Sequence, residues 1–292
     1  MTVQKIETEF AGRPLTLETG RMAKQAAGAV LVQFGETQVL AAVTVSPNIS
    51  TLPFFPLTVE YREKTYAAGR IPGGFLKREG RPSDEEILAA RLIDRSIRPL
   101  FPEGFKNEVQ VFVTVLSADQ ENDADIVGLI AASTALSLST VPWNGPLAAV
   151  RVGRVDGNWI LNPTFQQLEI SDIDLVVSGS ADSIMMVEGG SLEVSEQEML
   201  DALGVAQKGI AELVGVEKKL VSKAQPEKME WQAPAADADL ASAVRKLAEK
   251  KVTAAMNAKD KHGRAGNLRT VRDEVLAALA EKFPELQKEV VN

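Results

Sequence analysis

Alternating apolar and polar positions run through the first part of the chain and predict β-strands. The clearest pattern is at 108–117, where four valines share one face and Phe112 and Leu116 lie on the other. Because both faces carry apolar residues, we expect this strand to be covered on both sides. Four more strands are expected, at 15–19, 29–34, 37–45 and 57–63, with Gly35-Glu36 as a hairpin turn between two of them.

The helical patterns are marked by their ends as much as by their periodicity. Residues 126–139 are apolar almost all round, which predicts a buried helix. Ser83-Asp84-Glu85-Glu86 is a capping box that starts a helix, and Pro99 is placed to end it. A second capping box, Ser195–Glu198, opens a helix that we expect to run towards Val214.

The remaining pattern divides the chain. Short strands are expected at 148–153, 159–161, 168–177 and 184–188. Residues 215–236, with two prolines and scattered charge, are interpreted as a linker, and helices are expected at 238–258 and 268–282. The prediction is an α+β core at 1–214, made of mixed β-sheets with packed helices, the linker, and a small all-α domain at 237–292.

Composition narrows the functional classes. The chain has 292 residues, no cysteine and a formal net charge of −8, so disulfides and thiolate metal sites are excluded. The N-terminus lacks the apolar run of a signal peptide, and no stretch reaches the ~18 apolar residues of a membrane span, so a cytoplasmic protein is expected. A binding site for a polyanion must therefore be a local concentration of positive charge.

One such concentration lies at 69–99, which holds seven lysines and arginines against five carboxylates. Gly73-Gly74 allows a tight turn, and an aromatic ring follows it beside several cations. A base stacks on such a ring while cations hold phosphates, so the pattern is typical of single-stranded nucleic-acid binding. The candidate contacts in this loop are Phe75, Leu76, Lys77, Arg78 and Arg81.

The helix that follows adds three candidates. Arg91, Arg95 and Arg98 are spaced at i, i+4 and i+7, so all three are expected on one side of it. The alternative is that Arg91 and Arg95 pair with Asp94, Glu86 or carboxylates elsewhere in the fold.

Longer stretches carry a family resemblance. "FFPLTVEYREKTYAAGRIPGGFLKREGRPSDEEILAARLIDRSIRPLFPEGF" and "DIVGLIAASTALSLSTVPWNGPLAAVRVG" closely resemble bacterial polynucleotide phosphorylases, in the first of their two RNase PH-like cores, a ribosomal protein S5 domain 2-like fold. The match extends through "LEISDIDLVVSGSADSIMMVEGGSLEVSEQEML" into the helical segment. The resemblance implies an N-terminal fragment, without the second core and the KH and S1 domains.

The function it implies is that of a polyribonucleotide nucleotidyltransferase, a 3′-to-5′ exoribonuclease in mRNA degradation that uses inorganic phosphate as co-substrate. It further implies Mg²⁺ or Mn²⁺, a homotrimeric ring, single-stranded RNA as substrate and partners in RNA-degradation complexes. In this resemblance the basic loop lines the channel mouth and grips RNA.

The resemblance places the phosphate and metal sites in the second core. At the position matching its phosphate site, this chain has Asp123 and Asp125 before the buried helix, which would repel a phosphate. The weak metal candidates are Asp172 and Asp174, but Gln166 stands where the family's metal site has another aspartate. Being two apart on an expected strand, the two aspartates share a face, and surface charges are the favoured interpretation over a metal site. No catalytic residue is assigned.

Three hypotheses stay open. The first is an RNA-capturing, ring-forming core without catalysis of its own. The second is a catalytically competent phosphorolytic core that uses Asp172 or Asp174 for metal and the helix arginines for phosphate. The third is a purely structural assembly domain whose arginines bridge subunits.

Overall fold

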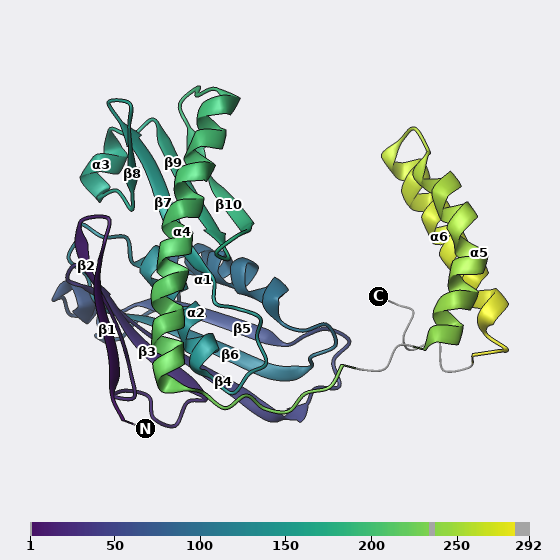
Figure 1. The fold of residues 1–292 in the computed structure, drawn as a ribbon, viewed down its shortest axis with the longest axis horizontal. Helices are drawn as coiled ribbons and strands as arrows, with labels where there is room; N and C mark the ends of the chain where they lie inside the picture. Colours follow the sequence, from purple (N-terminus) through teal and green to yellow (C-terminus); the bar gives the residue numbers. More distant parts are fainter. Residues whose placement is uncertain (1, 234–236, 284–292) are drawn as a thin grey trace. The chain divides into compact units, whose positions relative to one another are not determined.

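The computed structural model describes residues 2–233 and 237–283 and divides the chain into two compact units, 1–233 and 234–292 (Figure 1). The first contains two antiparallel or mixed β-sheets with packed helices, and the second is entirely helical. The predicted α+β class is confirmed.

A six-stranded sheet forms the base of the first unit, in the order β1-β2-β3-β4-β6-β5. Only the β5–β6 pair is parallel, because the chain crosses over through a helix between these two strands. The strands predicted from alternation are present. The strand bounds are β1 Gln4–Phe10, β2 Arg13–Thr19, β3 Gly28–Phe34, β4 Thr37–Ile49, β5 Leu57–Glu63 and β6 Asn107–Ser117.

Two helices cover one face of this sheet. α2 (Ala124–Leu138) contacts β3, β4 and β6, and α1 (Asp84–Ile97) contacts β5. α2 is buried along nearly its whole length, as its all-round apolar pattern predicts. The opposite face of β6 is open to solvent, with Phe112 38% exposed. The expectation that β6 is covered on both sides is therefore wrong for this chain.

The second sheet has the order β10-β9-β7-β8 and is antiparallel throughout. Its strands are β7 Ala148–Val155, β8 Asn158–Leu161, β9 Ile173–Gly179 and β10 Ile184–Ser191. The expected strand at 168–177 is partly wrong. Its first residues belong to the short helix α3 (Phe165–Glu169), which a capping box of Thr164 and Gln167 starts.

α4 (Glu196–Ala224) is longer than predicted and contacts both β1 and the second sheet (Figure 1). It begins at the predicted capping box of Ser195, but it continues past Val214 because Val216, Glu217 and Leu220 are buried against the core. A left-handed Gln225 ends it.

The segment after α4 also packs on the first unit. The Met229 N–H donates to the Thr140 carbonyl at 2.7 Å, and the ring of Trp231 lies 6.3 Å from that of Phe105. The predicted linker 215–236 is thus helical up to Ala224 and then packed on the first unit up to residue 233, and residues 234–236 lie outside the described part.

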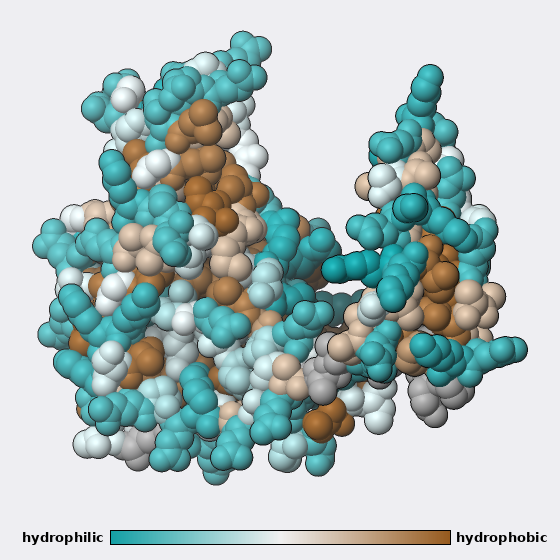
Figure 2. Space-filling model, turned by 45° about the vertical axis from the view of Figure 1, so that its right-hand side comes forward, coloured by the Kyte–Doolittle hydropathy of each residue, from teal (hydrophilic) through white to brown (hydrophobic). Residues whose placement is uncertain are grey.

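The second unit is a helical hairpin of α5 (Ala238–Met256) and α6 (Lys261–Leu279). α6 starts earlier than the predicted 268, because the Asp260 side chain accepts from the Gly263 N–H at 2.7 Å and caps a first turn that contains glycines. Val275 and Leu279 are buried between the helices. Figure 2 shows apolar side chains as a band on this unit, flanked by hydrophilic ones.

Candidate functional site

The basic loop leaves β5 through a short 3-10 turn, Thr65–Ala68, and enters α1 at Ser83. Its tip turns at Gly74, with φ of 73°, and at Lys77, with φ of 50°. The Phe75 side chain is 99% exposed and Leu76 is 73% exposed. A large aromatic ring that is fully solvated contributes no packing energy to the fold, so it is available to a ligand.

The cations of this loop are also available. Lys77, Arg78 and Arg81 are exposed, and none of them forms an ion pair within residues 2–233 and 237–283. The five side chains predicted as loop contacts therefore lie together on one exposed segment, as the sequence suggested.

The structure does not bring together Arg91 and Arg95 of α1 and Arg98, which follows the last residue of α1. Arg95 pairs with Glu188 of β10, and Arg98 pairs with Asp94 at 2.7 Å and donates to the carbonyls of Phe55 and Leu57. Arg91 is exposed and has no ion pair among the described residues. Helical spacing places the three on one side, but long side chains follow the nearest carboxylate, so only Arg91 keeps an uncompensated charge.

Arg91 lies beside the loop in a surface groove. The groove has a volume of about 590 Å³ and runs between β5 and α1, with Pro82 at the loop end and Ile87, Ala90 and Arg91 on the helix. Arg98 and Asp94 also line it. The groove adjoins the loop at Pro82, and the carboxylates of Glu60, Glu86 and Asp94 line it together with Arg91.

Acidic side chains occupy the N-terminus of α2. Asp123 caps the helix, and Asp123 and Asp125 each lie 2.9 Å from the guanidinium of Arg151 on β7. Burial, together with the neighbouring Asp123, raises the pKa of Asp125 above its usual range. The helix N-terminus is therefore filled by carboxylates of the chain itself, which leaves no positive site for a phosphate.

The two metal candidates are separated. Asp174 pairs with Arg151 at 2.9 Å, whereas Asp172 pairs with Arg154 at 2.6 Å. Arg151 and Arg154 are three apart on β7 and so point to opposite faces. The expectation that the two aspartates share a face is wrong, because Asp172 precedes β9 and does not follow its alternation.

Neither aspartate fits a metal ion. Each carboxylate is neutralised by an arginine, and within the described residues no group of three or more acidic, histidine or cysteine side chains is placed to hold one. The divalent metal that the resemblance implies is therefore not matched by these side chains.

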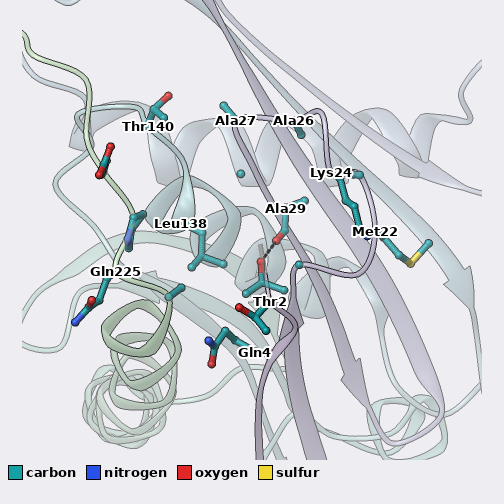
Figure 3. Close-up of a pocket in the computed structure, with 17 residues that line it drawn as sticks. Thr2, Gln4, Met22, Lys24, Ala26, Ala27, Ala29, Leu138, Thr140 and Gln225 are labelled. Atoms are coloured by element: carbon teal, nitrogen blue, oxygen red, sulfur yellow. Dashed lines mark hydrogen bonds between the residues drawn. The ribbon is translucent and has the colours of Figure 1, made fainter.

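Another cavity of the first unit is lined mostly by small and apolar residues. It measures about 520 Å³ and lies between the segment that follows β2, the start of the chain and the end of α4 (Figure 3). Among the described residues, Lys24 and Glu227 are its only ionisable lining side chains, and the Thr19 hydroxyl already donates to the Ala29 carbonyl.

The sequence did not predict the structural roles of two sets of charged residues. Glu79 and Glu86 hold the basic loop, and Arg151 neutralises the acidic cluster at α2. The one sequence signal for the first is the position of Glu79, a single carboxylate inside an otherwise basic loop.

Comparison with known proteins assigns the core. Residues 11–142 match the model for domain 1 of the 3′ exoribonuclease family, and residues 145–209 match its domain 2. The chain belongs to the 3′ exoribonuclease family. The predicted family is thereby confirmed.

Curated relatives of this 3′ exoribonuclease-family chain are polyribonucleotide nucleotidyltransferases. The protein from Gemmatimonas aurantiaca is 61% identical over 290 residues, which cover 99% of this chain and 40% of that protein. Those from Geotalea uraniireducens and Bacillus cytotoxicus are 48% and 47% identical, over 98% and 99% of this chain and 41% and 40% of their own lengths. The chain thus spans about two fifths of the length of these relatives.

None of the described helices combines the length and the apolar character that crossing a membrane requires.

Proposed function

We propose that this chain is the RNA-capturing part of a polyribonucleotide nucleotidyltransferase, a phosphate-dependent 3′-to-5′ exoribonuclease of mRNA degradation. The observation that carries the proposal is the exposed Phe75 beside Lys77, Arg78 and Arg81, cations that no carboxylate of the described chain neutralises. A base stacked on Phe75 contributes roughly 1–3 kcal/mol, and the cations hold the adjoining phosphates.

Catalysis belongs elsewhere in this proposal. The N-terminus of α2 holds Asp123 and Asp125 where a phosphate would bind, and Asp172 and Asp174 are each paired with an arginine. Inorganic phosphate and Mg²⁺ or Mn²⁺ would be held by parts of the longer enzyme that this chain does not contain. The enzyme would work as a homotrimer in the cytoplasm, with partners in RNA-degradation complexes.

Recognition of RNA in this proposal is independent of sequence. Stacking and phosphate contacts read no base edges, so little preference among sequences is expected. Arg91, in the groove next to the loop, would extend the path of the strand, whereas Arg95 and Arg98 would contribute less because Glu188 and Asp94 neutralise them.

The test is binding of single-stranded oligoadenylate by fluorescence anisotropy across a salt series. The variant Phe75→Ala/Lys77→Ala/Arg78→Ala is compared with the native chain. The expected loss of affinity is at least about tenfold, and the salt slope becomes shallower by about 0.7 for each phosphate that the variant no longer neutralises.

A matched control removes one exposed aromatic ring and two exposed lysines elsewhere. Phe165, Lys218 and Lys219 are exposed on α3 and α4, so Phe165→Ala/Lys218→Ala/Lys219→Ala makes the same change in charge. It is expected to bind RNA like the native chain. Equal affinity of the native chain and the loop variant would contradict the proposal and favour the structural assembly domain.

A further inference from the structure

Both ends of the basic loop are held by one side chain. The Glu86 carboxylate accepts from the Glu63 N–H at 2.8 Å through Oε1 and from the Ser83 N–H at 2.6 Å through Oε2. Glu63 is the last residue of β5, and Ser83 is the N-cap of α1. Glu86 is buried, so its carboxylate joins the two ends of the loop at its base.

Two further contacts cross the loop nearer its tip. The Arg62 guanidinium donates to the Gly80 carbonyl at 3.0 Å and lies 3.6 Å from Glu86 Oε1. Beyond it, Glu79 Oε1 accepts from the Thr65 N–H at 3.0 Å and from the Thr65 hydroxyl at 2.9 Å. The hydrogen bond from the Thr65 N–H is the main cause that holds the pKa of Glu79 below its usual value.

Glu79 is unexpected in a segment that binds a polyanion. It directly follows Lys77 and Arg78 and lies two residues before Arg81, so its negative charge opposes phosphate at the same place where the cations attract it. On electrostatic grounds alone, its removal would strengthen RNA binding. The structure instead shows that its carboxylate makes the contact between the loop and the chain that is nearest to the tip.

We propose that Glu79 is a positioning residue, which ties the loop to Thr65 and so holds Phe75, Lys77 and Arg78 in their binding arrangement before RNA arrives. A loop that is ordered in advance loses less conformational entropy on binding than one that RNA must order. The inference rests on the proposed function, since it assigns Glu79 a role in RNA binding by the same loop.

The experiment separates positioning from charge by comparing three single variants, all of which remove one negative charge. Glu79→Ala removes the acceptor of both Thr65 hydrogen bonds, whereas Glu79→Gln keeps an amide oxygen that can accept them. Glu85→Ala is the matched control, because Glu85 is exposed at the start of α1 and makes no side-chain hydrogen bond or ion pair among the described residues.

Glu79→Ala is expected to change the RNA affinity in the opposite direction to the other two variants. Glu79→Ala weakens binding of single-stranded oligoadenylate about fivefold, the order of effect of ordering one or two side chains at an interface. Glu79→Gln and Glu85→Ala bind as tightly as the native chain or slightly more tightly, because each removes a repulsive charge without releasing the loop. Tighter binding by Glu79→Ala would show that charge alone matters and would overturn the proposal.

A second readout needs no RNA. Chymotrypsin cleaves after Phe75, and because a protease binds its substrate as an extended segment, release of the already exposed loop from Thr65 should let it adopt that conformation more often. The rate of cleavage is expected to rise several-fold in Glu79→Ala and to stay native-like in Glu79→Gln and Glu85→Ala. An unchanged rate in Glu79→Ala overturns the proposal whatever the RNA result. Faster cleavage in a protein whose native form binds no RNA overturns the proposed function, and with it the positioning role, leaving Glu79 as a structural anchor only.

Discussion

Arg151 and the cations of the basic loop, both in the first unit, differ in whether carboxylates neutralise them. The Arg151 side chain is 14% exposed and lies 2.9 Å from each of three carboxylates, Asp123, Asp125 and Asp174. Lys77, Arg78 and Arg81 are exposed and have no ion pair in the described part of the chain.

The difference shows how a chain with a net charge of −8 can still bind a polyanion. Around Arg151, positive charge is cancelled locally and joins β7 to the start of α2. In the basic loop, the cations form no ion pair among the described residues, and the carboxylate inside the loop, Glu79, is turned towards Thr65. What matters for RNA binding is the local placement of charge rather than the net charge.

The largest effect on the free energy of unfolding is expected from removing Arg151, the cation that Asp123, Asp125 and Asp174 share. Arg151→Met removes this cation, so the largely buried Asp125, whose pKa burial already raises, must either take up a proton or stay as an unpaired buried charge, and both destabilise the fold. The free energy of unfolding should fall by about 3–5 kcal/mol, as measured by urea denaturation.

The control for this variant is Arg91→Met, which removes an exposed arginine without an ion pair among the described residues. Its free energy of unfolding should stay within about 0.5 kcal/mol of the native value. A similar loss in both variants would mean that pairing does not distinguish the two groups.

A third kind of ionisable group in the first unit is a buried carboxyl group that has no cation beside it among the described residues. Glu217 on α4 is fully buried, and its Oε2 accepts from the Ser133 hydroxyl at 2.7 Å and the Thr134 hydroxyl at 3.0 Å. Burial raises the pKa of Glu217 well above its usual value, although these hydrogen bonds lower it. The folded protein therefore keeps the proton at a pH where the unfolded chain releases it.

The raised pKa of Glu217 makes the free energy of unfolding depend on pH. Because the folded state binds the extra proton, the free energy of unfolding falls as pH rises above the ordinary pKa of 4.5, by up to about 1.4 kcal/mol per pH unit, until the folded pKa is reached. Glu217→Gln keeps an acceptor for both hydroxyls and should remove the contribution of Glu217 to this slope, leaving that of Asp125, whose pKa burial also raises.

Urea denaturation between about pH 5 and about pH 8 measures this slope. The control is Glu212→Gln, an exposed glutamate on the same helix, which should keep the native slope. Equal slopes in the native chain and Glu217→Gln would show that Glu217 is ionised in the fold.

The sequence predicted the parts of the fold that are encoded locally. Alternation located β2 to β6, and the capping boxes located the starts of α1 and α4 at Ser83 and Ser195. β1 was missed because its residues are mostly polar and it lies at the edge of its sheet. The end of α4 was missed because burial of residues such as Leu220, a tertiary effect, overrides the weak helix propensity around Gly215.

The candidate site divides in the same way. The exposed loop could be predicted because glycines, an aromatic residue and cations follow one another within a few residues. The partners of its neighbours could not, because Arg95 meets Glu188 and Asp174 meets Arg151 across long separations in sequence. Periodicity predicts which face a side chain leaves from, but not which carboxylate it reaches.

The smallest effect on the free energy of unfolding is expected from replacing Asp174, the most exposed of the three carboxylates that pair with Arg151. The Asp174 side chain is 49% exposed, and Arg151 keeps Asp123 and Asp125 when Asp174 is replaced. Asp174→Asn should therefore lower the free energy of unfolding by less than about 1 kcal/mol.

Because Arg151 already neutralises Asp174, millimolar Mg²⁺ should shift the melting temperature of the native chain and of Asp174→Asn equally. A shift in the native chain that this variant lacks would instead assign Asp174 to a metal site and favour a catalytically competent core.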